Sequence, residues 1–214
     1  TSVSEIQDFI KDSRGSKQED NNTNFAILGR VAYSPFLGLE MGLSVHSGYI
    51  DDTDQNRMTI KAFDWTYQRG AFELVGEYGH ASIERDGFFE NSTTRKSDRM
   101  AGDMWGYYVE PRYHFMPQFL KDVAPTFFTD NSTFTAVLRV GQVDINQPTN
   151  TVREGDIRRT RITPGFNFRY TEDTVFKCEY QFNSEHGRRF NDDGHDRGTD
   201  ISNDSLVFSV STYF

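Results

Sequence analysis

The sequence predicts an all-β protein, an antiparallel transmembrane β-barrel of which about nine strands lie in these 214 residues. Three observations support this fold class. Long segments alternate apolar with polar residues, the connections between them alternate between short and long, and aromatic residues are abundant. Aromatic residues make up 14% of the chain although only 36% is hydrophobic. That balance is typical of a barrel whose inner face is polar and whose outer face carries aromatic girdles.

The clearest alternation closes the chain, over residues 204–214. Alternate residues form an apolar face and a mostly small, polar face, as the period of a β-strand requires. The first face carries Leu206, Phe208, Val210, Thr212 and Phe214, and the second carries Val207, Ser209, Ser211 and Tyr213. Such a strand, ending in phenylalanine, looks like the closing strand of a bacterial outer-membrane barrel. We therefore expect that location, with outer-membrane lipid, lipopolysaccharide and the barrel-assembly machinery as partners, the last engaged through the C-terminal strand.

The other expected strands follow from the same alternation, and most exceed the length usual in soluble sheets. They are long enough for a tilted strand to cross a membrane, which takes about nine to eleven residues. Residues 1–23 differ and are interpreted as a polar loop with a short helical insert, so that the barrel occupies residues 24–214. The expected strands span residues 24–34, 37–49, 56–67, 71–84, 104–116, 133–146, 158–171, 174–186 and 204–214.

Charged residues recur on the polar side of several strands. Such charges would be prohibitive inside a dry closed sheet but are normal in a water-filled lumen. The predicted pore-lining residues are Glu110, Arg112, Arg139, Arg159, Arg161, Arg169, Lys177 and Glu179. The arginines have two interpretations: a wall that attracts anions, or partners of the glutamates and of one another. A cross-strand pair between Arg139 and Glu110 would cancel charge rather than create a field.

The connections predict which end of each strand faces which side of the membrane. Tight turns are expected near residues 34–36, 68–70 and 171–173. Longer polar connections lie near residues 50–55, 85–103, 147–157 and 187–203. Short turns are usually periplasmic in such barrels and long loops extracellular. Residues 116–132 are an exception, because they are long and apolar on the short-turn side, and we expect a short helix or plug there.

Several phrases resemble the phosphate-selective porin O and P family. They are residues 25–33 (FAILGRVAY), 35–44 (PFLGLEMGLS), 70–78 (GAFELVGEY) and, most specific, 105–113 (WGYYVEPRY). The resemblance extends over most of residues 24–214. It implies a C-terminal portion of a bacterial outer-membrane porin of roughly sixteen strands, often trimeric, that passes small anions. This chain departs from the family in its net charge of -9, and the family's arginine ladder and lysine cluster do not align.

The strand count and direction predict that the chain is incomplete. Nine is odd, whereas single-chain bacterial barrels have an even number of strands. Lipid does not tolerate the raw edges of an open sheet. We therefore expect further strands and a signal peptide upstream of Thr1.

Other features exclude several functions. The acidic net charge argues against nucleic acid, and the single cysteine, Cys178, excludes an internal disulfide framework. The five histidines lack metal-ligand spacing, and residues 191–200 lack the spacing of an EF-hand loop. No GxSxG, phosphate-binding loop or GxGxxG motif is present. We expect neither an enzyme nor a cofactor or metal site.

The leading interpretation is a porin that gives small hydrophilic solutes, anions among them, passive diffusion through a polar lumen. A homotrimer is one expected assembly. The alternative is a non-conducting outer-membrane barrel, either structural or adhesive or a barrel enzyme. A soluble β-sandwich or binding module is a third reading.

Overall fold

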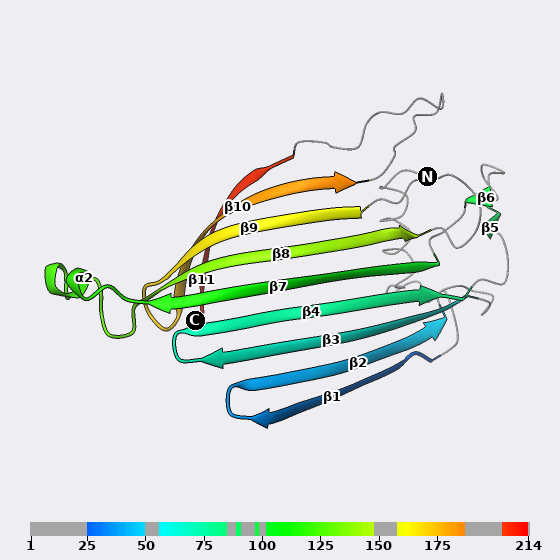
Figure 1. The fold of residues 1–214 in the computed structure, drawn as a ribbon, viewed down its shortest axis with the longest axis horizontal. Coiled ribbons are helices and arrows are strands. Elements are labelled where there is room, and N and C mark those ends of the chain that lie inside the picture. Colours follow the sequence, from blue (N-terminus) through cyan, green and yellow to red (C-terminus); the bar gives the residue numbers. More distant parts are fainter. Residues whose placement is uncertain are drawn as a thin grey trace.

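The computed structural model describes residues 25–49, 56–84, 89–90, 97–98, 102–147, 158–186 and 203–213. Within these residues one antiparallel sheet of nine strands has the order β1-β2-β3-β4-β7-β8-β9-β10-β11 (Figure 1). Two short strands, β5 and β6, pair separately. The helical insert expected in residues 1–23, the terminal Phe214 and most of the long connections lie outside the described residues.

All of the expected strands are confirmed, with ends that differ by a few residues from the prediction. The large sheet contains β1 (Ile27–Phe36), β2 (Leu39–Tyr49), β3 (Arg57–Arg69), β4 (Phe72–Ile83), β7 (Asp103–Phe115), β8 (Thr133–Gln147), β9 (Arg158–Arg169), β10 (Thr174–His186) and β11 (Ser205–Thr212). The separate pair is β5 (Phe89–Glu90) with β6 (Ser97–Asp98), and the helix α2 spans Gln118–Val123.

The sheet is an antiparallel meander in which neighbouring strands of the large sheet follow one another along the chain. Among the described residues it does not close, and β1 and β11 are its edges. Every residue of β1 is exposed, as is most of β11. The described strands therefore form a curved wall with two open edges.

Short turns join β1 to β2, β3 to β4 and β9 to β10 at one end of this wall, which is also the end that carries α2 (Figure 1). The expected turn at residues 34–36 is wrong in position, because these residues continue β1 across an irregularity after Tyr33. The chain turns at Leu37 and Gly38 instead. Gly38 has φ of 94°, a conformation that glycine adopts readily and proline cannot, so the turn forms at Gly38 and not at Pro35. Pro35 lies instead at the irregularity in β1, and proline is tolerated at a bulge on an edge strand.

The next expected turn, at residues 68–70, is also displaced, to Gly70 and Ala71. Gly70 has φ of 59°, which explains why β3 ends before it. The turn expected at residues 171–173 is confirmed.

The short helix expected between residues 116 and 132 is confirmed as α2. It lies beyond the strand ends rather than over the sheet, and none of its residues is buried (Figure 1). The connection is anchored by aromatic contacts, in which Phe127 lies 5.0 Å from Tyr170 and Phe128 lies 5.7 Å from Phe168, between ring centroids. No helix among the described residues is long and apolar enough to cross a membrane.

An ion pair joins Lys121 of α2 to Asp130, farther along the same connection, with 2.9 Å between Nζ and Oδ1. The hydrogen bond from Lys121, with its charge, holds the pKa of Asp130 below the ordinary 3.8. A carboxylate whose pKa is lower in the folded state stabilises that state at any pH above its unfolded-state pKa. This stabilisation is lost as the pH falls through the folded-state pKa. We expect the Asp130→Asn variant to lose this acid dependence. Hydrogen exchange of residues 117–132, followed from pH 6 down to about pH 2, measures it; identical profiles for wild type and variant would contradict the expectation.

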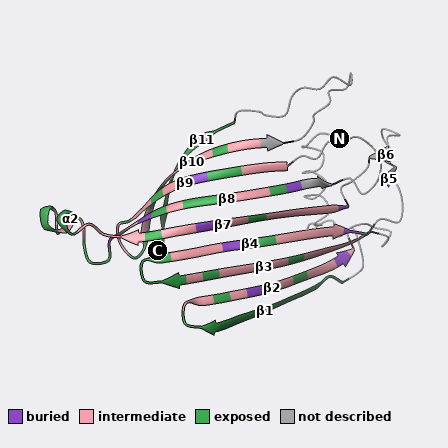
Figure 2. Cartoon of the chain, in the orientation of Figure 1, coloured by how far each residue is buried: buried purple, intermediate pink, exposed green. Residues whose placement is uncertain are grey.

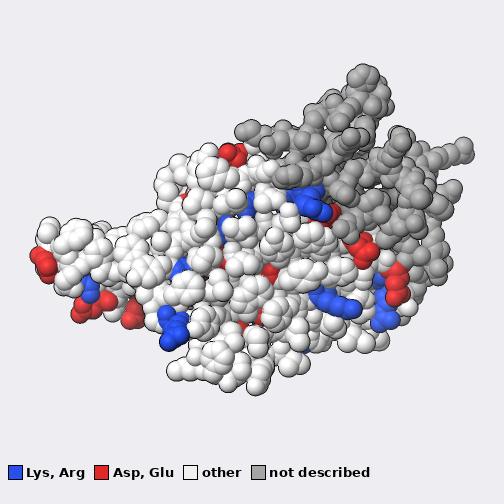
Figure 3. All heavy atoms as spheres, in the orientation of Figure 1, with Lys and Arg blue, Asp and Glu red and all other residues white. Residues whose placement is uncertain are grey.

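The two faces of the sheet differ in chemistry, and its apolar face is not packed against another layer. Among the described residues, Ile83 is the single buried hydrophobic side chain. Large side chains on the apolar face are exposed, for example Val31 (70%), Leu43 (62%) and Phe208 (71%) (Figure 2). The face seen in Figure 3 carries few charged atoms over its middle. A soluble domain would bury such a face against a second layer.

Gly76 is required by a close contact on this apolar face. It pairs with Trp65 across β3 and β4, and a β-carbon there would overlap the indole ring. We expect Gly76→Ala to lower the free energy of unfolding by about 1–3 kcal/mol, because overpacking displaces the ring. Denaturant titration followed by tryptophan emission measures this loss.

The matched control is Gly79→Ala on the same strand, where a β-carbon meets nothing within 4 Å. Its free energy of unfolding should stay within about 0.5 kcal/mol of wild type. Equal losses in the two variants would mean that the indole contact does not limit residue size at Gly76.

Candidate functional site

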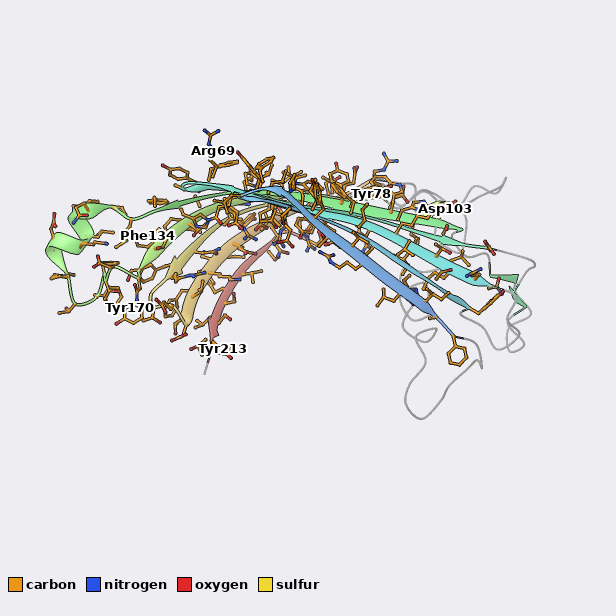
Figure 4. The ribbon with its side chains drawn as sticks, turned by 90° about the horizontal axis from the view of Figure 1, so that it is seen from below. Arg69, Tyr78, Asp103, Phe134, Tyr170 and Tyr213 are labelled. Atoms are coloured by element: carbon orange, nitrogen blue, oxygen red, sulfur yellow. The ribbon has the colours of Figure 1, made fainter. Side chains whose placement is uncertain are left out.

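The polar face of the sheet is the concave one. In Figure 4 the strands at both edges bend toward the same side, whereas Arg69 and Tyr78 point to the opposite, convex side. The pairing register places all eight predicted pore-lining residues together on the concave face. Arg112 is in register with Val137, Gly141 with Arg161, and Glu179 with Gly165. The eight residues therefore share one face of the sheet. That they line a pore stays a prediction.

A chain of charged hydrogen bonds crosses the middle of this face. Glu110 is only 3% exposed and binds two arginines, Arg112 at 2.5 Å and Arg139. Arg112 also binds Glu73 of β4 at 3.0 Å. The predicted cross-strand pair of Arg139 with Glu110 is confirmed. The two carboxylates and two guanidinium groups largely cancel one another, so Arg112 and Arg139 are not free to form an anion-attracting wall.

His114 continues this series of hydrogen bonds beyond Glu73. One ring nitrogen lies 3.0 Å from Glu73, and the other lies 2.9 Å from the hydroxyl of Thr135. We call the set the Glu110 network; its members are Glu73, Glu110, Arg112, His114, Thr135 and Arg139. Neither Glu73 and Thr135 nor the role of His114 was predicted from the sequence. Their alternation placed them on the polar face, but only the register shows which residues meet.

A second ion pair lies on β1 and β3. Arg30 donates to both carboxylate oxygens of Asp64, at 2.6 and 2.9 Å. The pair spans Gly42 of β2, where a β-carbon would overlap both side chains. This pair was not predicted from the sequence either, although a glycine inside a strand can indicate that another group approaches the backbone closely.

The basic residues of β9 and β10 have fewer carboxylate partners. Arg161 donates from Nε to the side-chain oxygen of Asn183 at 2.7 Å, and no described carboxylate pairs with it. Arg169 and Lys177 are exposed. The anion-attracting interpretation therefore fits β9 and β10, and the pairing interpretation fits Glu110 and its neighbours.

A hollow of about 520 Å³ is lined by residues of β4, β7, β8, β9 and β10. On the concave side its lining includes Glu77, Tyr108, Arg159, Arg161 and Asn183. Gly79, Gly106 and Gly141 also line it and contribute no side chains, which leaves the space open. The hollow is large enough for a small organic solute.

No group of three or more His, Cys, Asp or Glu side chains in the described residues could hold a metal ion. His195 and the acidic segment 191–200 lie outside the described residues. Cys178 is a free thiol on the convex face, in register with Phe166 and Phe208. Its setting is apolar, as the alternation of residues in this strand predicts.

No protein-family model matches this chain, and no curated protein matches it either. Among solved structures, the chain is similar to an anion-selective porin from Comamonas acidovorans, with a TM-score of 0.51 and 12% sequence identity. The similarity covers 87% of this chain and 47% of the porin, so the chain spans about half of that protein's length. At this identity the similarity concerns the fold, an antiparallel β-barrel wall. The resemblance to the phosphate-selective porin O and P family stays a prediction.

Proposed function

We propose that this chain forms the wall of a porin-type channel in the bacterial outer membrane, through which small hydrophilic solutes diffuse passively. The observation that carries the proposal is the opposite chemistry of the two sheet faces. The convex face exposes apolar side chains that suit lipid, and the concave face holds ionised groups that need water. The similar porin structure supports the same architecture.

Small anions are the solutes that we favour among simple ions. The similar solved porin is described as anion-selective. In this chain Arg161, Arg169 and Lys177 supply positive charge that no described carboxylate neutralises by direct pairing. The phrase at residues 105–113 supports membership of the phosphate-selective porin O and P family. The expected partners are lipid, lipopolysaccharide and the assembly machinery, and a homotrimer is one proposed assembly.

Planar-bilayer recording of the purified full-length protein tests this function. We expect discrete conductance steps in potassium chloride and a reversal potential on the anion-selective side in a salt gradient. A folded protein, verified by heat-modifiable migration on a detergent gel, that gives no steps would overturn the proposal. That outcome would favour a non-conducting barrel, whereas a protein soluble without detergent would favour a β-sandwich.

A further inference from the structure

Positive and negative side chains lie on different halves of the concave face. The carboxylates of β2 to β7 are accompanied by two arginines, Arg30 of the neighbouring β1 and Arg112 of β7; they are those of Glu40, Asp64, Glu73, Glu77 and Glu110. The cations of β8 to β10 are Arg139, Arg159, Arg161, Arg169 and Lys177, accompanied by two carboxylate residues of β10, Glu179 and, in register with Arg159, Glu185. The face is therefore acidic on one side and basic on the other.

Internal ion pairs do not remove this separation. Asp64 is neutralised by Arg30, and the Glu110 network pairs Glu73 and Glu110 with Arg112 and Arg139. Glu77, on the acidic half, is exposed, and among the described residues no ion pair joins it to a cation. Arg161, on the basic half, is held by the neutral amide of Asn183. Each of these groups keeps its charge available to a solute.

Glu77 and Arg161 lie in one row across the sheet, at opposite sides of the hollow. Register joins Glu77 to Tyr108, Tyr108 to Gly141, and Gly141 to Arg161. The row spans three strand steps, roughly 14 Å between backbones, a distance that the long side chains of Glu and Arg are able to span in part. Tyr108 lies between them beneath Arg139, whose guanidinium carbon is 5.2 Å from the ring centroid. Gly141 places no side chain in the row.

We propose that this hollow is a binding site for short zwitterionic solutes of the size of a di- or tripeptide. The amino end would bind Glu77, and the carboxylate would bind Arg161, whose orientation Asn183 fixes. A tripeptide spans at most about 11 Å, which matches the row better than a free amino acid, whose two charges are adjacent. A singly charged solute satisfies only one of the two groups. The inference rests on the proposed channel for its physiological role and deepens it by naming a solute class.

Titration calorimetry on the detergent-solubilised full-length protein tests the site without requiring conduction. The probes are trialanine with both ends free, N-acetylated, C-amidated, and blocked at both ends, with alanine as the length control. We expect the free-ended tripeptide to bind about three- to tenfold more tightly than each singly blocked form. Alanine and the doubly blocked peptide should bind more weakly still. Equal or tighter binding of the N-acetylated anion would overturn the zwitterion proposal.

Two variants identify the groups. Glu77→Gln should remove the preference for a free amino end, and Arg161→Gln should remove the preference for a free carboxylate, each by a similar factor. Arg69→Gln is the matched control, since Arg69 points away from the concave face (Figure 4), and it should bind all probes as wild type does. Unchanged probe preferences in Glu77→Gln and Arg161→Gln would overturn the site.

Conductance measured in parallel separates this inference from the proposed function. Binding with the expected preference but no conductance steps would keep the site and overturn the channel. Conductance without any preference among the peptides would keep the channel and overturn the site.

Discussion

Replacing Phe208 with arginine is expected to lower the free energy of unfolding in lipid vesicles by about 2–4 kcal/mol. Phe208 is 71% exposed on the convex face, near the middle of β11. If the convex face lay in water, replacing this exposed side chain would change the free energy of unfolding very little. In a bilayer, however, the guanidinium would be carried into hydrocarbon, where its desolvation is costly. Urea titration of the refolded protein measures the difference.

Val207→Arg is the matched control, since it introduces the same side chain one residue earlier on the opposite face. Val207 pairs in register with Glu179, so an arginine there reaches water and gains a carboxylate neighbour. We expect a change of no more than about 0.5 kcal/mol. Similar losses at both positions would show that the two faces do not meet different solvents.

Glu110→Gln is expected to disturb both stability and ion selectivity. The neutral side chain would no longer balance Arg112 and Arg139, which it contacts from a nearly fully buried position. Breaking a buried pair costs about 3–5 kcal/mol, but both arginines are partly exposed and can be hydrated. We therefore expect about 1–2 kcal/mol at neutral pH, together with a rise in the anion-to-cation permeability ratio of about twofold or more.

Urea titration and reversal potentials in a salt gradient measure these two effects. Glu179→Gln is the control, because it removes the same charge from the concave face at a residue without a described ion pair. This variant should shift the reversal potential slightly and leave the free energy of unfolding unchanged. If Glu110→Gln behaved no differently from Glu179→Gln, the Glu110 network would have no structural role.

Alternation of residue types was sufficient to predict the strands, because successive residues of a strand lie on opposite faces of the sheet and the two faces here differ in chemistry. β7 illustrates this: Trp105, Tyr107 and Val109 lie on one side, and Tyr108 and Glu110 on the other. The positions of the turns were less predictable. Pro35 predicted the first turn at residues 34–36, but β1 continues through Pro35 with a bulge and the chain turns at Gly38.

The contacts of the site depended on register, which a single strand does not reveal. Arg139 and Glu110 could be paired because both were expected near mid-height on adjacent strands. Glu73 could not be assigned to Arg112, since that contact requires the exact offset between β4 and β7. The hollow beside Arg161 likewise depends on three glycines brought together from β4, β7 and β8.

The central claim is that the convex face contacts lipid and the concave face contacts water. Single cysteines at Val137, Leu138, Val140 and Gly141 of β8, in a Cys178→Ser background, allow a fluorophore to report on each face. In vesicles, we expect labels at 138 and 140 to be quenched by nitroxide lipids, and labels at 137 and 141 by aqueous acrylamide. Quenching of all four labels by acrylamide, with none by the nitroxide lipids, would contradict the account.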